Sequence, residues 1–189
     1  MFMSREDLKK YPKCAKLLGA LAGTLPGQAK VFNAFLDACM ADDQTQSTKV
    51  ARTMALTKAL PWGPGPRIDV TVDVHATDSG QIVEACGYQV PFKLQGRPDI
   101  IQITSVWFDA VEFGVVDTQK NAGRLTRTLL HELVHWVRQE AGASDEVQIG
   151  GHYKGRTMEA GHFFEQNAFG SPNVCTSDEL LDAVLSRRD

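Results

Sequence analysis

The chain has 189 residues, 43% of them hydrophobic and 23% charged, so it fits one ordinary globular domain and is unlike a disordered or fibrous protein. A net charge of -3, without any run of five basic residues, argues against nucleic acid as a partner. The start mixes acids and bases where a signal peptide needs an apolar core, and no apolar stretch approaches the roughly 18 residues that span a bilayer. We expect neither membrane insertion nor export by an ordinary cleaved leader.

Residues 1–60 predict a helical segment that packs on the rest of the chain. Ser4 stands before an acidic turn and can begin the first helix, and Pro26-Gly27 separates it from a second. A third helix is expected from Thr48 to Leu60, where Pro61 ends it. The apolar positions at helical spacing are Leu17, Leu18, Leu21, Val31, Phe32, Phe35 and Leu36.

The proline- and glycine-rich stretch 61–66 marks the one plausible boundary, and residues 67–189 form the expected catalytic region. From Ile68 the hydrophobic period changes from helical to two, which predicts strands. The expected strands are Ile68–Val74, Ile82–Val90, Ile100–Val106 and, more weakly, Val111–Val116. Together they predict an α+β fold with a small mixed or antiparallel sheet.

A long helix is expected to follow. Asp117 can cap it, an apolar stripe runs through it, and Gly142 stands where a helix C-terminus favours glycine. Residues 142–157 read as a loop, with Thr157 capping a helix that runs to Phe169. A last amphipathic helix is expected over Ser177–Leu185.

The four cysteines stand singly, without a CxxC pair, so a cysteine zinc site is not indicated. They are Cys14, Cys39, Cys86 and Cys175. We expect buried free thiols, with two disulfides as the alternative.

The chemistry is indicated by the pentapeptide HELVH at 131–135, a complete HExxH motif. On a helix, His131 and His135 project from one face and can bind one Zn²⁺, while Glu132 can act as general base toward water. A catalytic zinc normally has a third protein ligand. Glu159 is the best placed, because it follows a glycine-rich turn and can return opposite the two imidazoles. The other candidates are Asp145, His152, His162 and Glu165.

This arrangement resembles the gluzincin clan of zincin-fold peptidases, in which a helix-borne glutamate some 20 residues after HExxH is the third ligand. Residues 159–170 are also similar to an E-x-G-x-x-x-E…F-G pattern of bacterial metallopeptidase toxin domains, including effectors delivered by type VI secretion systems. The resemblance covers roughly residues 100–170. It implies a zincin-like fold, Glu159 as the ligand and Glu165 as a supporting acid. Phe163 stands where gluzincins often have an aspartate, so Glu165 or a backbone carbonyl is expected to support the first histidine.

Stabilisation of the developing oxyanion needs a further donor. His152, Tyr153, Arg156 and His162 are the nearby candidates, and we favour His162 and Tyr153 as catalytic residues. His75 is expected to be an ordinary surface or hydrogen-bonded histidine.

The leading hypothesis is a zinc endopeptidase that cleaves a protein or peptide held beside an edge strand such as Ile100–Val106. A toxin or effector secreted by a specialised system fits best, with a cytoplasmic enzyme as the alternative, and its partners would be secretion machinery and a cognate immunity protein. Two other hypotheses are a zinc amidase acting on cell-wall peptide and a non-catalytic metal-binding module. The intact Glu132 argues against the last.

Overall fold

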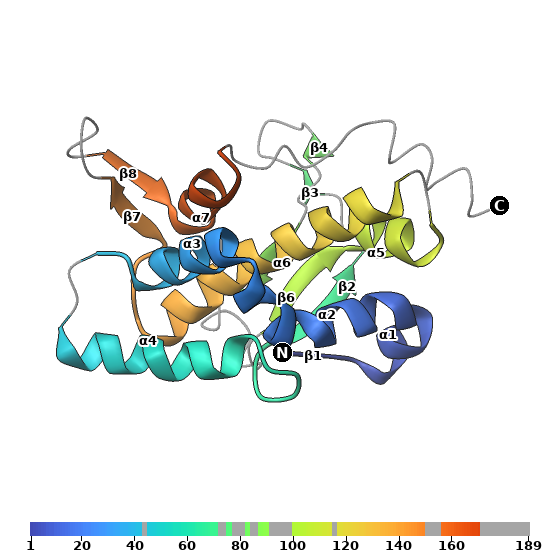
Figure 1. The fold of residues 1–189 in the computed structure, drawn as a ribbon, viewed down its shortest axis with the longest axis horizontal. Helices are drawn as coiled ribbons and strands as arrows, with labels where there is room; N and C mark the ends of the chain where they lie inside the picture. Colours follow the sequence, from blue (N-terminus) through green and yellow to red (C-terminus); the bar gives the residue numbers. More distant parts are fainter. Residues whose placement is uncertain are drawn as a thin grey trace.

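The computed structural model describes residues 1–42, 45–71, 75–76, 82–83, 87–90, 100–114, 117–149 and 156–170. Within them the α-helices are α1 (Arg5–Lys10), α2 (Pro12–Thr24), α3 (Ala29–Met40), α4 (Gln46–Ala59), α5 (Ser105–Glu112), α6 (Thr118–Glu140) and α7 (Ala160–Phe169), with a 3₁₀ turn at Leu25–Gly27. The strands are β1 (Phe2–Met3), β2 (Arg67–Thr71), β3 (His75–Ala76), β4 (Ile82–Val83), β5 (Gly87–Val90), β6 (Ile100–Thr104), β7 (Glu146–Ile149) and β8 (Arg156–Glu159). The predicted α+β fold class is confirmed, and helices predominate (Figure 1).

The largest sheet is mixed, with the order β1-β2-β6-β5. Strands β1, β2 and β6 are parallel, and β5 runs antiparallel to β6. The prediction that Ile100–Val106 forms an edge strand is wrong, because β6 has β2 on one side and β5 on the other. Hydrophobic alternation shows that a strand is half buried, but it does not show how many neighbours pair with it.

Two other predicted strands also differ. Within Ile82–Val90 the described residues belong to two sheets, since β4 pairs with β3 while β5 joins the large sheet. The weak strand from Val111 is wrong, because the chain turns into α5 at Ser105 and stays helical to Glu112. Every residue of α5 is buried, including the polar Ser105, Asp109 and Glu112, so no face of this short helix is exposed to solvent. A short buried segment of this kind is hard to distinguish from a buried strand by periodicity.

The N-terminal helices follow the prediction with one extra break. Ser4 caps α1, with its Oγ accepting from the backbone N–H of Asp7, but Tyr11 ends that helix and Pro12 begins α2. The predicted separation at Pro26-Gly27 falls in the 3₁₀ turn. Phe35 of α3 meets Phe164 of α7 edge to face, and both side chains belong to one hydrophobic cluster that includes α6. The boundary at 61–66 stays a prediction.

Helix α6 is the element on which the others pack. Figure 1 shows it crossing the molecule, and α3, α4, α5 and α7 all contact it. Asp117 caps it as predicted, accepting from the backbone N–H of Lys120, and Gly142 just beyond its end has a left-handed φ of 68°. The buried stripe includes Leu125, Leu129, Leu133 and Val137. This burial fixes which face of the helix carries the polar motif.

The segment after α6 is not the predicted loop. Strands β7 and β8 form an antiparallel hairpin, so Thr157 lies in a strand and Glu159 is the residue that caps α7. Each strand of the hairpin has only four residues, which is too few for an alternating hydrophobic pattern to be recognised in a glycine-rich segment. The predicted helix at 177–185 lies outside the described residues.

Cys14 and Cys39 are buried free thiols, as expected, while Cys86 and Cys175 lie outside the described residues. In the described part of the chain, no helix is long and apolar enough to cross a membrane.

Candidate metal centre

The two histidines of the motif lie one turn apart on one face of α6. Their ring centroids are 5.1 Å apart, and both side chains are largely buried. The residues between and around them, including Leu133 and Val134, are part of the core. The apolar stripe of α6 therefore packs into the core, and the Nε2 atoms of both imidazoles face Glu159.

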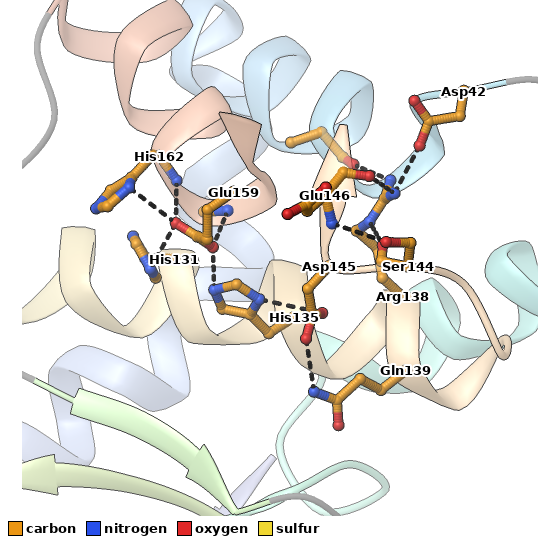
Figure 2. Close-up of polar contacts among 12 residues, drawn as sticks. Asp42, His131, His135, Arg138, Gln139, Ser144, Asp145, Glu146, Glu159 and His162 are labelled. Atoms are coloured by element: carbon orange, nitrogen blue, oxygen red, sulfur yellow. Dashed lines mark hydrogen bonds and ion pairs between the residues drawn. The ribbon is translucent and has the colours of Figure 1, made fainter. Parts of the chain in front are cut away.

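Glu159 comes to the same point from the β7–β8 hairpin. Its carboxylate caps α7, accepting from the backbone N–H of Gly161 at 2.7 Å and from that of His162 at 2.8 Å. It also lies 3.6 Å from Nε2 of His131 and contacts Nε2 of His135 (Figure 2). Being tied to the helix N-terminus, the carboxylate has little freedom to turn away from the imidazoles.

The three side chains form a plausible metal-binding set. One ligand atom from each of His131, His135 and Glu159 lies within 4.8 Å of the others. Two imidazoles and one carboxylate, with a coordination position left open, are a donor set typical of catalytic zinc. The residues present therefore fit a divalent metal ion.

Each imidazole has a second carboxylate at its outer nitrogen. Nδ1 of His131 lies 3.2 Å from Oε1 of Glu165, and Nδ1 of His135 lies 3.3 Å from Oδ1 of Asp145. Arg127 pairs with Glu165 at 3.3 Å, and Gln139 donates to Asp145 at 3.2 Å. With the proton on Nδ1, each ring donates to its carboxylate and presents the Nε2 lone pair toward Glu159, which is how metal-binding histidines are commonly oriented.

Carboxylates surround the two imidazoles, and their negative charge shifts the pKa values in this centre. Burial lowers the pKa of His135, but its hydrogen bonds to Asp145 and Glu159 outweigh burial and raise the pKa to about 10. Burial also lowers the pKa of His131, and the hydrogen bond to Glu165 with the nearby carboxylates raises it above the usual value. Burial would raise the pKa of Glu159, yet the imidazoles lower it to about 2. The centre thus favours a positive charge, which a divalent cation would supply.

Glu132 is the remaining acid of the motif. It is buried at 5% exposure, and burial raises its pKa despite the two imidazoles nearby. A carboxyl group with a raised pKa holds a proton more readily than an ordinary glutamate, which suits a group that accepts and returns protons.

Of the four candidate oxyanion donors, the structure describes His162 and Arg156. His162 is half exposed; its Nδ1 lies 3.2 Å from Oε2 of Glu159 and its ring centroid is 5.3 Å from that of His131. Arg156 lies in β8 with its side chain exposed. His152 and Tyr153, together with the side chain of His75, lie outside the described residues.

Sequence reasoning missed two features of the site. The sequence offers Asp145 only as a candidate direct ligand, and a weak one, since ten residues after His135 it cannot share that helical face. In the structure the turn at Gly142 brings its carboxylate to Nδ1 of His135 instead. Gly161 was noted only as part of a pattern, although a Cβ there would overlap the imidazole of His131. The turn signal at Gly142 was available in the sequence, but the direction in which the chain returns was not.

Comparison with known families adds an independent observation. Residues 7–170 match the family described as metallopeptidase toxin 3, a longer span than the 100–170 of the sequence resemblance. No curated protein and no solved structure matches the chain. Because the family match takes in the N-terminal helices, the HExxH helix and all of α7 alike, the chain belongs to the metallopeptidase toxin 3 family.

Proposed function

We propose that this protein is a zinc-dependent, gluzincin-type metallopeptidase whose ligands are His131, His135 and Glu159. The observation that carries the proposal is the convergence of both Nε2 atoms on the Glu159 carboxylate, within 4.8 Å of one another. The outer carboxylates of Glu165 and Asp145 support it, since they orient the rings for coordination. In an ordinary surface cluster of acids and histidines, we would not expect a carboxylate at the outer nitrogen of each imidazole.

Zn²⁺ at this position would supply a Lewis acid that lowers the pKa of water to near neutrality and polarises a peptide carbonyl. The chain itself would move the proton: Glu132, buried beside the imidazoles, would accept it from water and deliver it to the departing amine nitrogen. His162, half exposed next to Glu159, is our candidate donor to the developing oxyanion. Tyr153 stays a prediction for the same role.

A zincin-like arrangement is part of the proposal. The mixed sheet lies against α6, with both β5 and β6 in contact with that helix. Since β6 is interior, β5 takes its place as the strand along which an extended substrate would pair, because it ends the order of the large sheet in the described part of the chain.

We further propose that the enzyme acts on a protein substrate as a toxin delivered by a specialised secretion system such as type VI, with an immunity protein as its partner. Membership of a metallopeptidase toxin family supports this assignment. If the enzyme hydrolyses cell-wall peptide and not protein, it is a zinc amidase instead.

The test combines metal content with turnover. Elemental analysis is expected to find about one zinc per chain, lost in His131→Ala, His135→Ala and Glu159→Ala and kept in Glu132→Gln. Hydrolysis of denatured casein is expected to fall at least about a hundredfold in Glu132→Gln, because the general base is removed while the metal stays. Peptidoglycan fragments serve as the parallel substrate.

Two results would contradict the proposal. Full zinc content in both histidine variants would place the metal elsewhere, and unchanged turnover in Glu132→Gln would remove that carboxylate from the reaction. A wild type that binds zinc but cleaves neither substrate would leave a non-catalytic metal-binding module.

A further inference from the structure

We infer that Arg138 is a positioning residue of the metal centre, which sets the places of Asp145 and Glu159 by holding the backbone of residues 144–146 against α6. The inference rests on the proposed function, because it concerns the same metal site. It adds a residue that neither the HExxH motif nor the ligand set contains.

Arg138 is one turn beyond His135 on α6 and is fully buried, at 0% exposure. Its Nε donates to the carbonyl oxygen of Ser144 at 2.7 Å, and its Nη2 donates to that of Glu146 at 3.2 Å. These two carbonyls flank Asp145. The guanidinium therefore holds the backbone on both sides of the residue whose side chain meets Nδ1 of His135 (Figure 2).

The other side of the guanidinium is anchored to the end of α3. Nη1 donates to the carbonyl oxygen of Ala38 at 3.0 Å, and Nη2 donates to Oδ2 of Asp42 at 2.7 Å. Oδ1 of Asp42 in turn accepts from the backbone N–H of Gln148 in β7 at 3.0 Å. Arg138 and Asp42 thus join α3, α6 and the hairpin, three segments far apart in the sequence.

The position of the backbone at residues 144–146 also determines the position of the candidate ligand Glu159. The carbonyl oxygen of Asp145 accepts from the backbone N–H of Ala160 at 2.7 Å, and Glu146 pairs with Glu159 in the β7–β8 register. A shift of this backbone would therefore move Asp145 away from His135 and move Glu159 at the same time. The positions of the candidate ligand Glu159 and of Asp145, which contacts the ligand His135, thus both depend on one buried side chain.

The geometry of the arginine side chain explains its place here better than a contribution to stability does. A buried ion pair adds little stability over a well-packed apolar pair, because desolvation offsets the attraction. A planar guanidinium, however, offers five donors in fixed directions, and here they reach four carbonyl oxygens and one carboxylate. A lysine has three donors on one atom and cannot reach all of these acceptors together.

The experiment compares Arg138→Lys and Arg138→Met with a matched control, Arg52→Met. Arg52 is a second buried arginine that donates to the carbonyl oxygens of Cys39 and Ala41 at the end of α3, the same helix end that Arg138 contacts. Among its described hydrogen bonds, none reaches the hairpin. Thermal unfolding of the metal-free proteins identifies variants that keep the fold.

The first readout is the Kd for Zn²⁺, measured by competition with a chelator. Both Arg138 variants are expected to weaken zinc binding about 10- to 100-fold, the effect known for residues that orient metal ligands. The second readout is hydrogen exchange of the Gln148 and Ala160 amides in metal-free protein, which should quicken. Arg52→Met is expected to lower the unfolding temperature while keeping the wild-type Kd.

A folded Arg138→Lys with the wild-type Kd and unchanged exchange would overturn the inference. If Arg138→Met does not fold, Asp42→Asn replaces it, since that change removes only the charge of the partner and should weaken zinc binding in the same direction. Equal losses of zinc affinity in the Arg52 and Arg138 variants would also overturn it, because they would indicate general destabilisation. Failure of the proposed function is recognised separately, by zinc retained in His131→Ala and His135→Ala.

Discussion

Replacement of Gly161 by alanine tests the packing of α7 against the HExxH helix. Gly161 is the second residue of α7, where alanine would normally favour the helix by up to about 1 kcal/mol over glycine. In this structure a Cβ would lie 2.6 Å from Cε1 of His131, and nearer still to two other ring atoms. Carbon atoms pack at about 3.5–4.0 Å, so the ring or the helix must move by about 1 Å.

The overlap should outweigh the helix preference. Overpacking of this kind costs about 1–3 kcal/mol, and subtracting the helix preference of up to about 1 kcal/mol leaves a net loss of up to about 2 kcal/mol in the free energy of unfolding. For a chain of this size the unfolding temperature should fall by up to about 8 °C. Displacing an imidazole by about 1 Å should also lower peptidase turnover about a hundredfold.

The matched control is Gly123→Ala in α6, where a Cβ would meet nothing within 4 Å. That variant should gain about 0.5–1 kcal/mol and unfold about 1–4 °C higher, with activity unchanged. Differential scanning calorimetry of metal-free protein, with casein turnover of the zinc-loaded protein, gives both quantities. If Gly161→Ala were as stable and as active as Gly123→Ala, the close approach of α7 to His131 would be refuted.

Two further predictions concern the carboxylates at the outer imidazole nitrogens and a buried thiol. Glu165→Gln and Asp145→Asn should each raise the Kd for Zn²⁺ about 10- to 100-fold in chelator competition, because each removes the charge at an imidazole Nδ1; unchanged values would show that these carboxylates do not support the ligands. Burial and the neighbouring Glu112 raise the pKa of the Cys14 thiol to about 12, so its thiolate is scarce at any pH below that value. A thiol reagent at pH 8 should label Cys14 only after unfolding, and rapid labelling of the native protein would contradict its burial.

The sequence alone was enough to find the helix that carries the HExxH motif. Its period of apolar residues, the cap at Asp117 and the glycine at 142 are local signals, and each was confirmed. The position of His131 and His135 on one face follows from helix geometry, whatever the rest of the fold does. The free, buried state of Cys14 and the α+β class were also predicted.

Local signals failed where burial is complete or where strands are short. Helix α5 is only eight residues long and buried on all sides, its polar residues included, so there was no exposed face by which to distinguish it from a strand. The β7–β8 hairpin has only four residues in each strand and was taken for a loop. The interior place of β6 depends on β2 and β5, whose pairing is set by chain topology and not by the sequence of β6 itself.

The surroundings of the motif were decided by tertiary structure. Glu159 could be proposed as a ligand from its distance along the chain, but its place between two imidazoles depends on the hairpin that delivers it. Asp145 reaches His135 only because the chain turns back after α6, and Arg138 holds that turn through contacts with α3 about 100 residues away. Helix periodicity acts over four residues, whereas these contacts depend on how separate elements pack, and a single sequence carries no local signal for that.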